Sequence, residues 1–345
     1  MIRLDVGNPG QHAWTELVSG FRDNNLLQSW SYGAARVAGS GWRVERVTLF
    51  DGEQIVGAAQ ILIRPLPLVG GGLAWISRGP LWRRTGQEPQ RLFLDLVQAL
   101  RRHYAAGRGF YLRMAPTVNA LEWDGPEPRR AAAGFRISEV PGWASAILDL
   151  SPPEEALRQG LRQKWRNGLN VAERHDVDVR IDADGTGFDD FLAEYRSFVE
   201  DRGFSTSVTA GLLSAIQAEL PLAQKMICYR GSHDGEALGS VLMARYGDGA
   251  EYLAGTVLQK GRLFNIGQLL LWRAVLDLKA RHVRRLDLGG MDGELTPKGI
   301  FDFKRGLGGT PYRLVHEFEA TDGGLRADLV RWLVRRARST AGAGT

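Results

Sequence analysis

The chain of 345 residues is long enough for two domains, and 44% hydrophobic with 24% charged residues is the composition of an ordinary globular protein. No apolar run of about 18 residues predicts a membrane span, no signal-peptide core is present, and the single cysteine excludes an internal disulfide. We therefore expect a cytoplasmic protein, whose net charge of +5 suits an anionic partner such as a nucleotide or tRNA.

The first half of the chain predicts a helix followed by a β-hairpin, a third strand, a second helix and a closing strand. The hairpin strands flank Asp51-Gly52-Glu53, and Asp-Gly between apolar runs is a strong hairpin signal. The expected elements are a helix at 28–38, strands at 44–50, 55–64 and 73–77, a helix at about 90–106 and a strand at 110–114.

The second half repeats this order, with Asp234-Gly235-Glu236 at the corresponding hairpin. Its expected elements are a helix at 188–202, strands at 224–230, 237–246 and 250–256, a helix at about 262–280 and a strand at 283–289. The repeat predicts an α/β (α+β) fold of two tandem domains, each a mixed sheet flanked by helices.

A helix is predicted between the halves. Ser151-Pro152-Pro153-Glu154 has the pattern of a capping box, and an apolar face follows at Leu157, Leu161, Trp165 and Leu169. Basic residues between 158 and 174 lie mostly off that face, as a solvated surface or as a contact for tRNA phosphates.

A final helix is predicted at about 322–340. It has an apolar stripe of Leu325, Leu329, Trp332 and Leu333, and it ends in Arg335, Arg336 and Arg338. We expect the helix to pack back on the first domain, with peripheral membrane contact as the alternative. The first domain is accordingly placed at 1–147 and the second at 148–321.

Several catalytic motifs are absent from the sequence. The six histidines are scattered and form no HExxH or Cys/His pattern, so we expect no metal site. A GxSxG nucleophile elbow and a GxxxxGK[ST] phosphate loop are also missing. The chemistry is therefore expected to need neither a metal nor a serine nucleophile.

Six stretches of the chain resemble the Fem-type peptidyltransferases (FemA/FemB/FemX), which build peptidoglycan cross-bridges from aminoacyl-tRNA. They span about 280 residues in family order: LLQSWSYGAAR (26–36), ISRGPLW (76–82), LRQKWRNGLNVAERHDVDVR (161–180), EYLAGT (251–256), LDLGGMDG (286–293) and FDFKRGLGG (301–309). The resemblance implies two acetyltransferase-like (GNAT) domains in one chain. No heptad run interrupts the second half, so the chain is similar to the members without a coiled-coil arm.

The resemblance also implies a catalytic cleft at Phe303 and Lys304. Lys304 would stabilise the oxyanion of ester aminolysis or hold the terminal tRNA phosphate, and Phe303 would stack on the terminal adenine. Arg305, next to them, is expected to bind substrate as well. Alternatively, Phe301 and Phe303 alternate along a strand, with one of them in the core and with Lys304 and Arg305 solvated.

Three further residues are implied to bind the acceptor. Arg36 and Arg202 would hold phosphate oxygens, and Tyr252 would line the acceptor channel. The alternatives are ordinary surface arginines at helix ends and a core aromatic residue.

The function expected from the resemblance is aminoacyl transfer. Aminoacyl-tRNA would be the co-substrate, without a further cofactor, and the acceptor would be an amine of a UDP- or lipid-linked muramyl peptide. An acyl-CoA-dependent N-acyltransferase acting in polysaccharide or natural-product synthesis is the first alternative. Acetyltransferases of this arrangement hold coenzyme A in a [RQ]xxGx[GA] loop, which residues 259–267 match poorly. A non-catalytic RNA-binding or scaffold protein is the second alternative, against which the Phe303-Lys304 pair argues.

Overall fold

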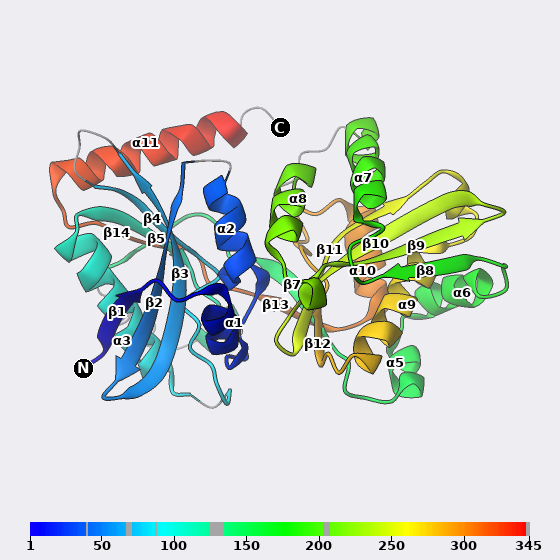
Figure 1. Cartoon of the computed structure of the whole chain (residues 1–345), viewed down its shortest axis with the longest axis horizontal. Helices are drawn as coiled ribbons and strands as arrows, with labels where there is room; N and C mark the ends of the chain where they lie inside the picture. The colour runs from blue at the N-terminus through cyan, green and yellow to red at the C-terminus, as the bar shows by residue number, and fades with distance from the viewer. Residues whose placement is uncertain (39–40, 67–70, 87, 124–133, 203–207, 343–345) are drawn as a thin grey trace. The chain divides into compact units, whose positions relative to one another are not determined.

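The computed structural model describes residues 1–38, 41–66, 71–86, 88–123, 134–202 and 208–342 (Figure 1). The chain divides into two compact units, residues 1–143 with 313–345 and residues 144–312. Each unit has its own sheet and its own hydrophobic core. Within the described ranges, no helix has the length and apolar character needed to cross a membrane.

The first unit contains a seven-stranded mixed sheet in the order β1-β2-β3-β4-β5-β14-β6. Its strands are β1 (Arg3–Gly7), β2 (Arg43–Asp51), β3 (Gln54–Pro65), β4 (Gly72–Ser77), β5 (Phe110–Ala115), β6 (Arg136–Ile137) and β14 (Phe318–Ala320). Strands β4 and β5 pair in parallel, and the other neighbouring strands run antiparallel. The predicted hairpin is confirmed, with Gly52 supplying a positive φ of 59° at its turn.

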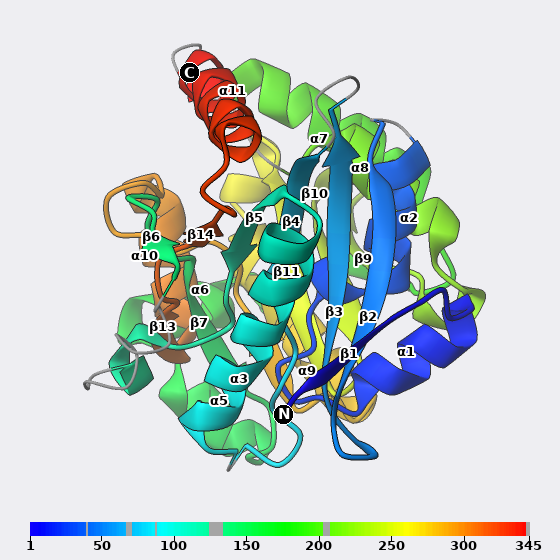
Figure 2. The same cartoon turned by 90° about the vertical axis from the view of Figure 1, so that its left-hand side faces the viewer.

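Helices cover both faces of this sheet. They are α1 (Gln11–Ser19), α2 (Trp30–Ala38), α3 (Gln90–Leu100), the π-helical turn η2 (Arg101–Gly107) that continues it, and α11 (Leu325–Gly342), with short 3-10 turns η1 (Leu26–Gln28) and η3 (Ala120–Trp123). Figure 2 shows α3 lying over β4 and β5, where Phe93 and Leu96 are fully buried in the core. Helix α11 contacts the same two strands through Val330, which packs on Leu73 and Tyr111 on the opposite face.

The second unit contains another seven-stranded sheet, in the order β13-β7-β12-β11-β10-β9-β8. Its strands are β7 (Ala144–Asp149), β8 (Asp178–Asp182), β9 (Ile227–His233), β10 (Glu236–Tyr246), β11 (Gly249–Val257), β12 (Arg285–Asp287) and β13 (Thr310–Arg313). Its helices are α5 (Glu154–Gly160), α6 (Gln163–Ala172), α7 (Phe188–Arg202), α8 (Ala210–Glu219), α9 (Ile266–Ala280) and α10 (Lys298–Leu307), with 3-10 turns η4 (Leu222–Gln224) and η5 (Lys260–Arg262).

The predicted repeat is visible in the two sheets. In each unit three antiparallel strands are followed by a helix and by a strand parallel to the third, as β2-β3-β4-α3-β5 and as β9-β10-β11-α9-β12. The predicted fold class, two tandem domains with mixed sheets flanked by helices, is confirmed. The described residues of the second unit contain no coiled-coil arm.

The predicted helix between the halves is broken into α5 and α6. Leu161 and Arg162 are extended, and the Arg162 amide donates to the Gly306 carbonyl at 3.0 Å. The break bends the chain so that all four residues of the predicted apolar face remain buried. The capping box is also wrong, because Pro153 precedes the first turn of α5 and no side chain caps it.

Two strands differ from the expected domain boundaries. Strand β7 spans the boundary expected between 147 and 148, although the whole strand pairs within the second sheet. Residues 318–320 fall within the range expected for the second domain, but they form β14, which pairs with β5 and β6 in the first sheet. The chain therefore returns to the first unit before residue 321.

Candidate functional site

Lys304 lies on α10, a helix and not the strand of the alternative interpretation. Its Nζ donates to the Gly290 carbonyl at 3.2 Å and lies 5.2 Å from the centroid of the Tyr252 ring. Strands β11 and β12 pair in parallel only as far as Glu251 and Asp287, and β11 then continues alone along that edge. The ammonium group therefore lies just beyond the point where the two strands stop pairing.

Burial changes the protonation of Lys304. Removal from water lowers the pKa of the Lys304 ammonium to about 8, although the nearby Asp287 and Glu251 act to raise it. Near neutral pH the group is still mostly charged, but it is much closer to losing its proton than an exposed lysine is. A buried cation with such a pKa is typical of a functional site.

Asp287 is held in a fixed position beneath this lysine. The buried carboxylate accepts hydrogen bonds from the Ser145 hydroxyl, from the Gly289 amide at 2.9 Å and from the Tyr312 hydroxyl at 2.7 Å. Gly289 has φ of 72°, and a Cβ there would lie 2.7 Å from the Tyr252 carbonyl oxygen. A side chain at this position would be strained and would clash, so the turn requires glycine.

Phe303 and Arg305 have other surroundings. The Phe303 ring packs 6.0 Å from the Trp165 ring and against Gly267, so it joins α10 to α6 and α9. The Arg305 guanidinium is about half exposed and pairs with Asp302 at 2.6 Å on its own helix. Roles for these two residues in substrate binding stay predictions.

A second carboxyl group faces β11 from α7. Glu194 accepts hydrogen bonds from the Ser240 hydroxyl at 3.1 Å and from the Thr256 hydroxyl, and burial raises its pKa. Burial likewise raises the pKa of Tyr252 to about 12, so its phenol stays protonated. Neither Glu194 nor Glu251 was identified as a candidate site residue from the sequence. A carboxylate within an apolar strand could have indicated Glu251.

The segment before α9 is where acetyltransferases of this arrangement would hold coenzyme A. Here the amides of Leu263, Asn265 and Gln268 donate to carbonyls of the same segment. The Phe264 ring lies 4.8 Å from the His175 ring and 4.9 Å from the His233 ring. Internal hydrogen bonds thus occupy three amides around the start of α9, and the Phe264 ring packs against two histidines.

In the first unit, Arg36 lies in the last turn of α2, 5.9 Å from the Trp42 ring. Arg36 and Arg78 both act to lower the pKa of Tyr32, against a larger effect of burial that raises it. Arg78, which sequence reasoning did not single out, is itself buried, with its guanidinium 4.5 Å from the Trp143 ring. Two arginines, Arg36 and Arg78, thus lie near one phenol.

Arg202 is the last residue of α7, and its side chain lies outside the described part of the structure. The described residues contain no group of acidic, histidine and cysteine side chains arranged to hold a metal ion.

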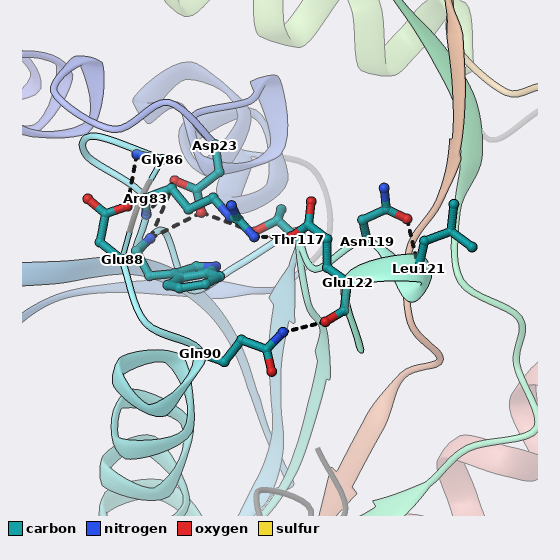
Figure 3. A network of polar contacts seen from close by, with 10 residues as sticks. Asp23, Arg83, Gly86, Glu88, Gln90, Thr117, Asn119, Leu121 and Glu122 are labelled. Carbon is teal, nitrogen blue, oxygen red and sulfur yellow. Dashed lines mark hydrogen bonds and ion pairs between the residues drawn. The ribbon is translucent and has the colours of Figure 1, made fainter. Parts of the chain in front are cut away.

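In the first unit, a separate network of hydrogen bonds stabilises the segment after β4 (Figure 3). Asp23 accepts hydrogen bonds from the amides of Trp82 and Arg83, at 3.1 Å each, and from the Thr117 hydroxyl. Burial raises the pKa of Asp23 to about 6. Glu88 accepts hydrogen bonds from the amides of Arg84, Thr85 and Gly86. Burial acts to raise the pKa of Glu88, but hydrogen bonds, chiefly from the amide and hydroxyl of Thr85, outweigh it and lower the pKa to about 2. We assign this network a structural role, because its acceptors are used by the chain's own amides.

Two family models match the chain. Residues 14–127 match the FemAB family, and residues 156–305 match the acetyltransferase (GNAT) domain. The structure is similar to a crystal structure of FemX, with 15% identity and a TM-score of 0.78 over 95% of this chain and 99% of that chain.

Further structural similarities are more distant. A conserved protein of unknown function from Bacteroides thetaiotaomicron has 9% identity and a TM-score of 0.59 over 92% of this chain and 99% of its own. The C-terminal domain of a putative lysylphosphatidylglycerol synthetase from Agrobacterium fabrum has 13% identity and a TM-score of 0.51, covering 92% and 95%. At these identities the structures share the fold, and no curated protein matches the sequence. The predicted resemblance is confirmed, and the family models support an acyltransferase enzyme.

Proposed function

We propose that this chain is an aminoacyltransferase, which moves an aminoacyl group from aminoacyl-tRNA to an amine of a peptidoglycan precursor peptide. The observation that carries the proposal is the buried Lys304 ammonium beyond the end of the β11-β12 pairing. It matches the position that the Fem-type resemblance assigns to catalysis. The proposed reaction is cytoplasmic, where charged tRNA is found.

The chemistry requires little beyond positioning and a fixed cation. The neutral acceptor amine adds to the carbonyl carbon of the aminoacyl ester, and negative charge develops on the carbonyl oxygen. Lys304 stabilises that oxyanion until the C–O bond to the ribose breaks. The amine loses a proton, the ribose hydroxyl gains one, and an amide is formed. An ester is already activated, so the step needs no protein nucleophile.

Asp287 acts on this chemistry through its position. Its carboxylate lies close enough to favour the charged form of Lys304, and Ser145 and Tyr312 hold it in place. Among the described residues, the Lys304 ammonium donates one hydrogen bond, to the Gly290 carbonyl, and we propose that its other two hydrogens bind the oxyanion.

For the acceptor, we propose that Arg36 and Arg202 bind the phosphates of a UDP- or lipid-linked muramyl peptide and that Tyr252 lines its path. The grouping of Arg36 and Arg78 around Tyr32 supports an anion site in the first unit. Arg78 therefore joins Arg36 as a candidate.

The occupied amides around the start of α9 favour tRNA over coenzyme A as the donor. A pyrophosphate is normally held by backbone amides in front of a helix. Here the amides of Leu263, Asn265 and Gln268 already have acceptors within the segment. An acyl-CoA-dependent N-acyltransferase remains the alternative, and it would have to bind the pyrophosphate without these three amides.

A donor assay tests the proposal. The protein is mixed with UDP-muramyl pentapeptide and with either charged tRNAs or a set of acyl-CoAs, and products are measured by mass spectrometry. We expect an amino-acid mass increment that requires tRNA and falls at least about 100-fold in Lys304→Ala. Lys298→Ala is the matched control, because Lys298 is an exposed lysine on the same helix.

Each result has a defined meaning. An acyl increment from coenzyme A would reject the tRNA donor in favour of the alternative. Equal activity of Lys304→Ala and Lys298→Ala would reject the catalytic role of Lys304. With a lipid-linked muramyl peptide as a parallel acceptor, the same assay determines which carrier the first unit accepts.

A further inference from the structure

The C-terminal helix α11 presents an apolar ridge to solvent. The ridge consists of Leu325, Leu329, Trp332 and Leu333, whose side chains are 90%, 45%, 52% and 39% exposed. Their spacing of four, three and one residues places them on one face of the helix over about two turns. Elsewhere in the first unit, large exposed apolar side chains such as Val6 and Leu121 lie on separate elements.

The ridge is not the face that docks the helix on its own unit. Val330, which is 1% exposed, packs on Leu73 and Tyr111, and the partly buried Val334 lies in the same cluster. Residues 330 and 334 are one turn apart and point away from the ridge. The helix packs on the first unit, as expected, but it does so through Val330 and Val334 and not through the apolar stripe. Valines dock the helix, so the larger leucines and the tryptophan remain in water.

Arginines accompany the ridge. The Arg336 guanidinium lies 5.3 Å from the centroid of the Trp332 ring. Arg331 pairs at 3.0 Å with Asp328, the acidic residue in the first turn. Tryptophan and leucine beside arginine are the side chains that interfacial helices place at the boundary between lipid headgroups and acyl chains. The net charge of +5 for the whole chain has the matching sign for an anionic surface.

We propose that α11 is an interfacial helix whose ridge inserts among the headgroups of an anionic phospholipid bilayer. The helix lies in the plane of the membrane, with Val330 still packed on the sheet and with Arg336 beside the lipid phosphates. A second copy of the chain fits the ridge less well. Four side chains on one helix offer much less than the roughly 800 Å² per partner of a stable interface, and symmetric pairing would bring like charges together. This inference does not rest on the proposed reaction.

Vesicle flotation tests the inference with the full chain. Vesicles contain phosphatidylcholine alone or phosphatidylcholine with about 30% phosphatidylglycerol, an anionic lipid. We expect at least about ten-fold more bound protein on the anionic vesicles, and loss of that binding in the double variant Leu329→Ser/Trp332→Ser. Leu121→Ser/Leu222→Ser is the control, because it removes two large apolar side chains that are more exposed than Leu329 and Trp332 and that lie on other elements. Arg336→Glu is expected to weaken binding to anionic vesicles alone.

Folding and self-association are measured in the same samples. The ridge side chains are exposed, so the double variant should keep the thermal midpoint and circular dichroism of the wild type. Equal binding by wild type and double variant, or binding that ignores the anionic lipid, overturns the proposal. Wild-type dimers that the double variant abolishes would assign the ridge to a second copy and would also overturn it. None of these readouts depends on acyl transfer.

Discussion

At the scale of the residue, the pH dependence of the reaction distinguishes two roles for Lys304. Because its pKa is lowered to about 8, a fixed cation at this position loses its charge as the pH rises through that value. We therefore expect kcat/KM to fall above about pH 8. Lys304→Arg keeps its charge at higher pH, so its residual activity should persist where that of the wild type falls.

The opposite profile would contradict the cationic role. If Lys304 acted as a neutral base, kcat/KM would rise through pH 8 and Lys304→Arg would be inactive at every pH. Lys298→Arg provides the control for a lysine-to-arginine change on the same helix. The acceptor amine must also be neutral, so the rising limb at lower pH belongs to the substrate.

Asp23 predicts a pH dependence of stability. Its folded pKa of about 6 lies above the ordinary value of 3.8, so the folded state holds this proton at pH values where the unfolded chain has released it. The stability contributed is present below about pH 4 and is lost as the pH rises to about 6. In Asp23→Asn this loss should be absent.

Urea unfolding between pH 4 and pH 7 gives the free energy of unfolding of the wild type and of Asp23→Asn. The difference between these two free energies should change by up to about 3 kcal/mol over that range, and it should be constant above pH 7. Using the difference removes the contributions of other carboxylates, such as Glu88, whose pKa is shifted in the other direction. A constant difference across the range would mean that Asp23 is ionised in the fold like an exposed aspartate.

Sequence analysis identified Lys304 as a candidate residue, but not the surrounding groups that affect its protonation. The lysine is part of a recognisable run, whereas Ser145 and Tyr312 reach Asp287 from other strands, 142 and 25 residues away in the chain. Asp287 looked like a structural residue at a strand end. Only the three-dimensional arrangement shows that its carboxylate also favours the charged form of Lys304.

At the scale of the element, two glycines of α10 give a matched pair of predictions. A Cβ at Gly306 would lie 2.5 Å from the Trp165 ring, whereas a Cβ at Gly299 meets nothing within 4 Å. Gly306→Ala should cost about 1–3 kcal/mol, since a rigid buried ring must move. Gly299→Ala should be neutral or stabilising by up to about 1 kcal/mol, because alanine favours a helix.

The Gly306→Ala variant is also expected to change the activity. A shift of α10 away from α6 also displaces Lys304, so Gly306→Ala should lower kcat more than stability alone explains under conditions where the variant is fully folded. Thermal midpoints and kcat of the two variants are compared at one temperature. Loss of stability with unchanged kcat would show that Lys304 tolerates movement of its helix.

The same helix shows why a short pattern was ambiguous. Phe301 and Phe303 alternate as strand residues do, but the segment follows Pro297, which suits a helix start, and it folds as α10. On a helix these two side chains point in different directions. Phe303 meets Trp165, and Phe301 lies 5.4 Å from the Arg305 guanidinium. Longer elements with a clear period, such as α7 and α9, were predicted close to their observed bounds.

At the scale of the whole molecule, the repeat was predictable because hairpin turns and apolar runs recur in order. The return of the chain to the first unit was harder to predict from the sequence. Strand β14 has three residues, which is too short for a period to be recognised, and its position is set by pairing with β5 and β6. The C-terminal helix carried two apolar patterns, and the more conspicuous one faces solvent.

This topology predicts that the two units differ as isolated fragments. Residues 144–313 contain the whole second sheet and its core, so this fragment should fold and unfold cooperatively in urea. Residues 1–143 lack β14 and α11, which bury Phe318 and Val330 in the full chain. Each of those side chains contributes about 1.5–3 kcal/mol by burial, and losing β14 also leaves β5 and β6 without the strand between them.

The fragment 1–143 should therefore show no cooperative transition by circular dichroism. Adding a peptide of residues 313–345 should restore one, because it supplies β14, α11 and the Glu317 partner of the buried Arg113. The same peptide carrying Phe318→Ala is the control and should restore less. Cooperative unfolding of 1–143 alone would contradict this account, since it would mean that β1 to β6 form a stable core without the returning segment.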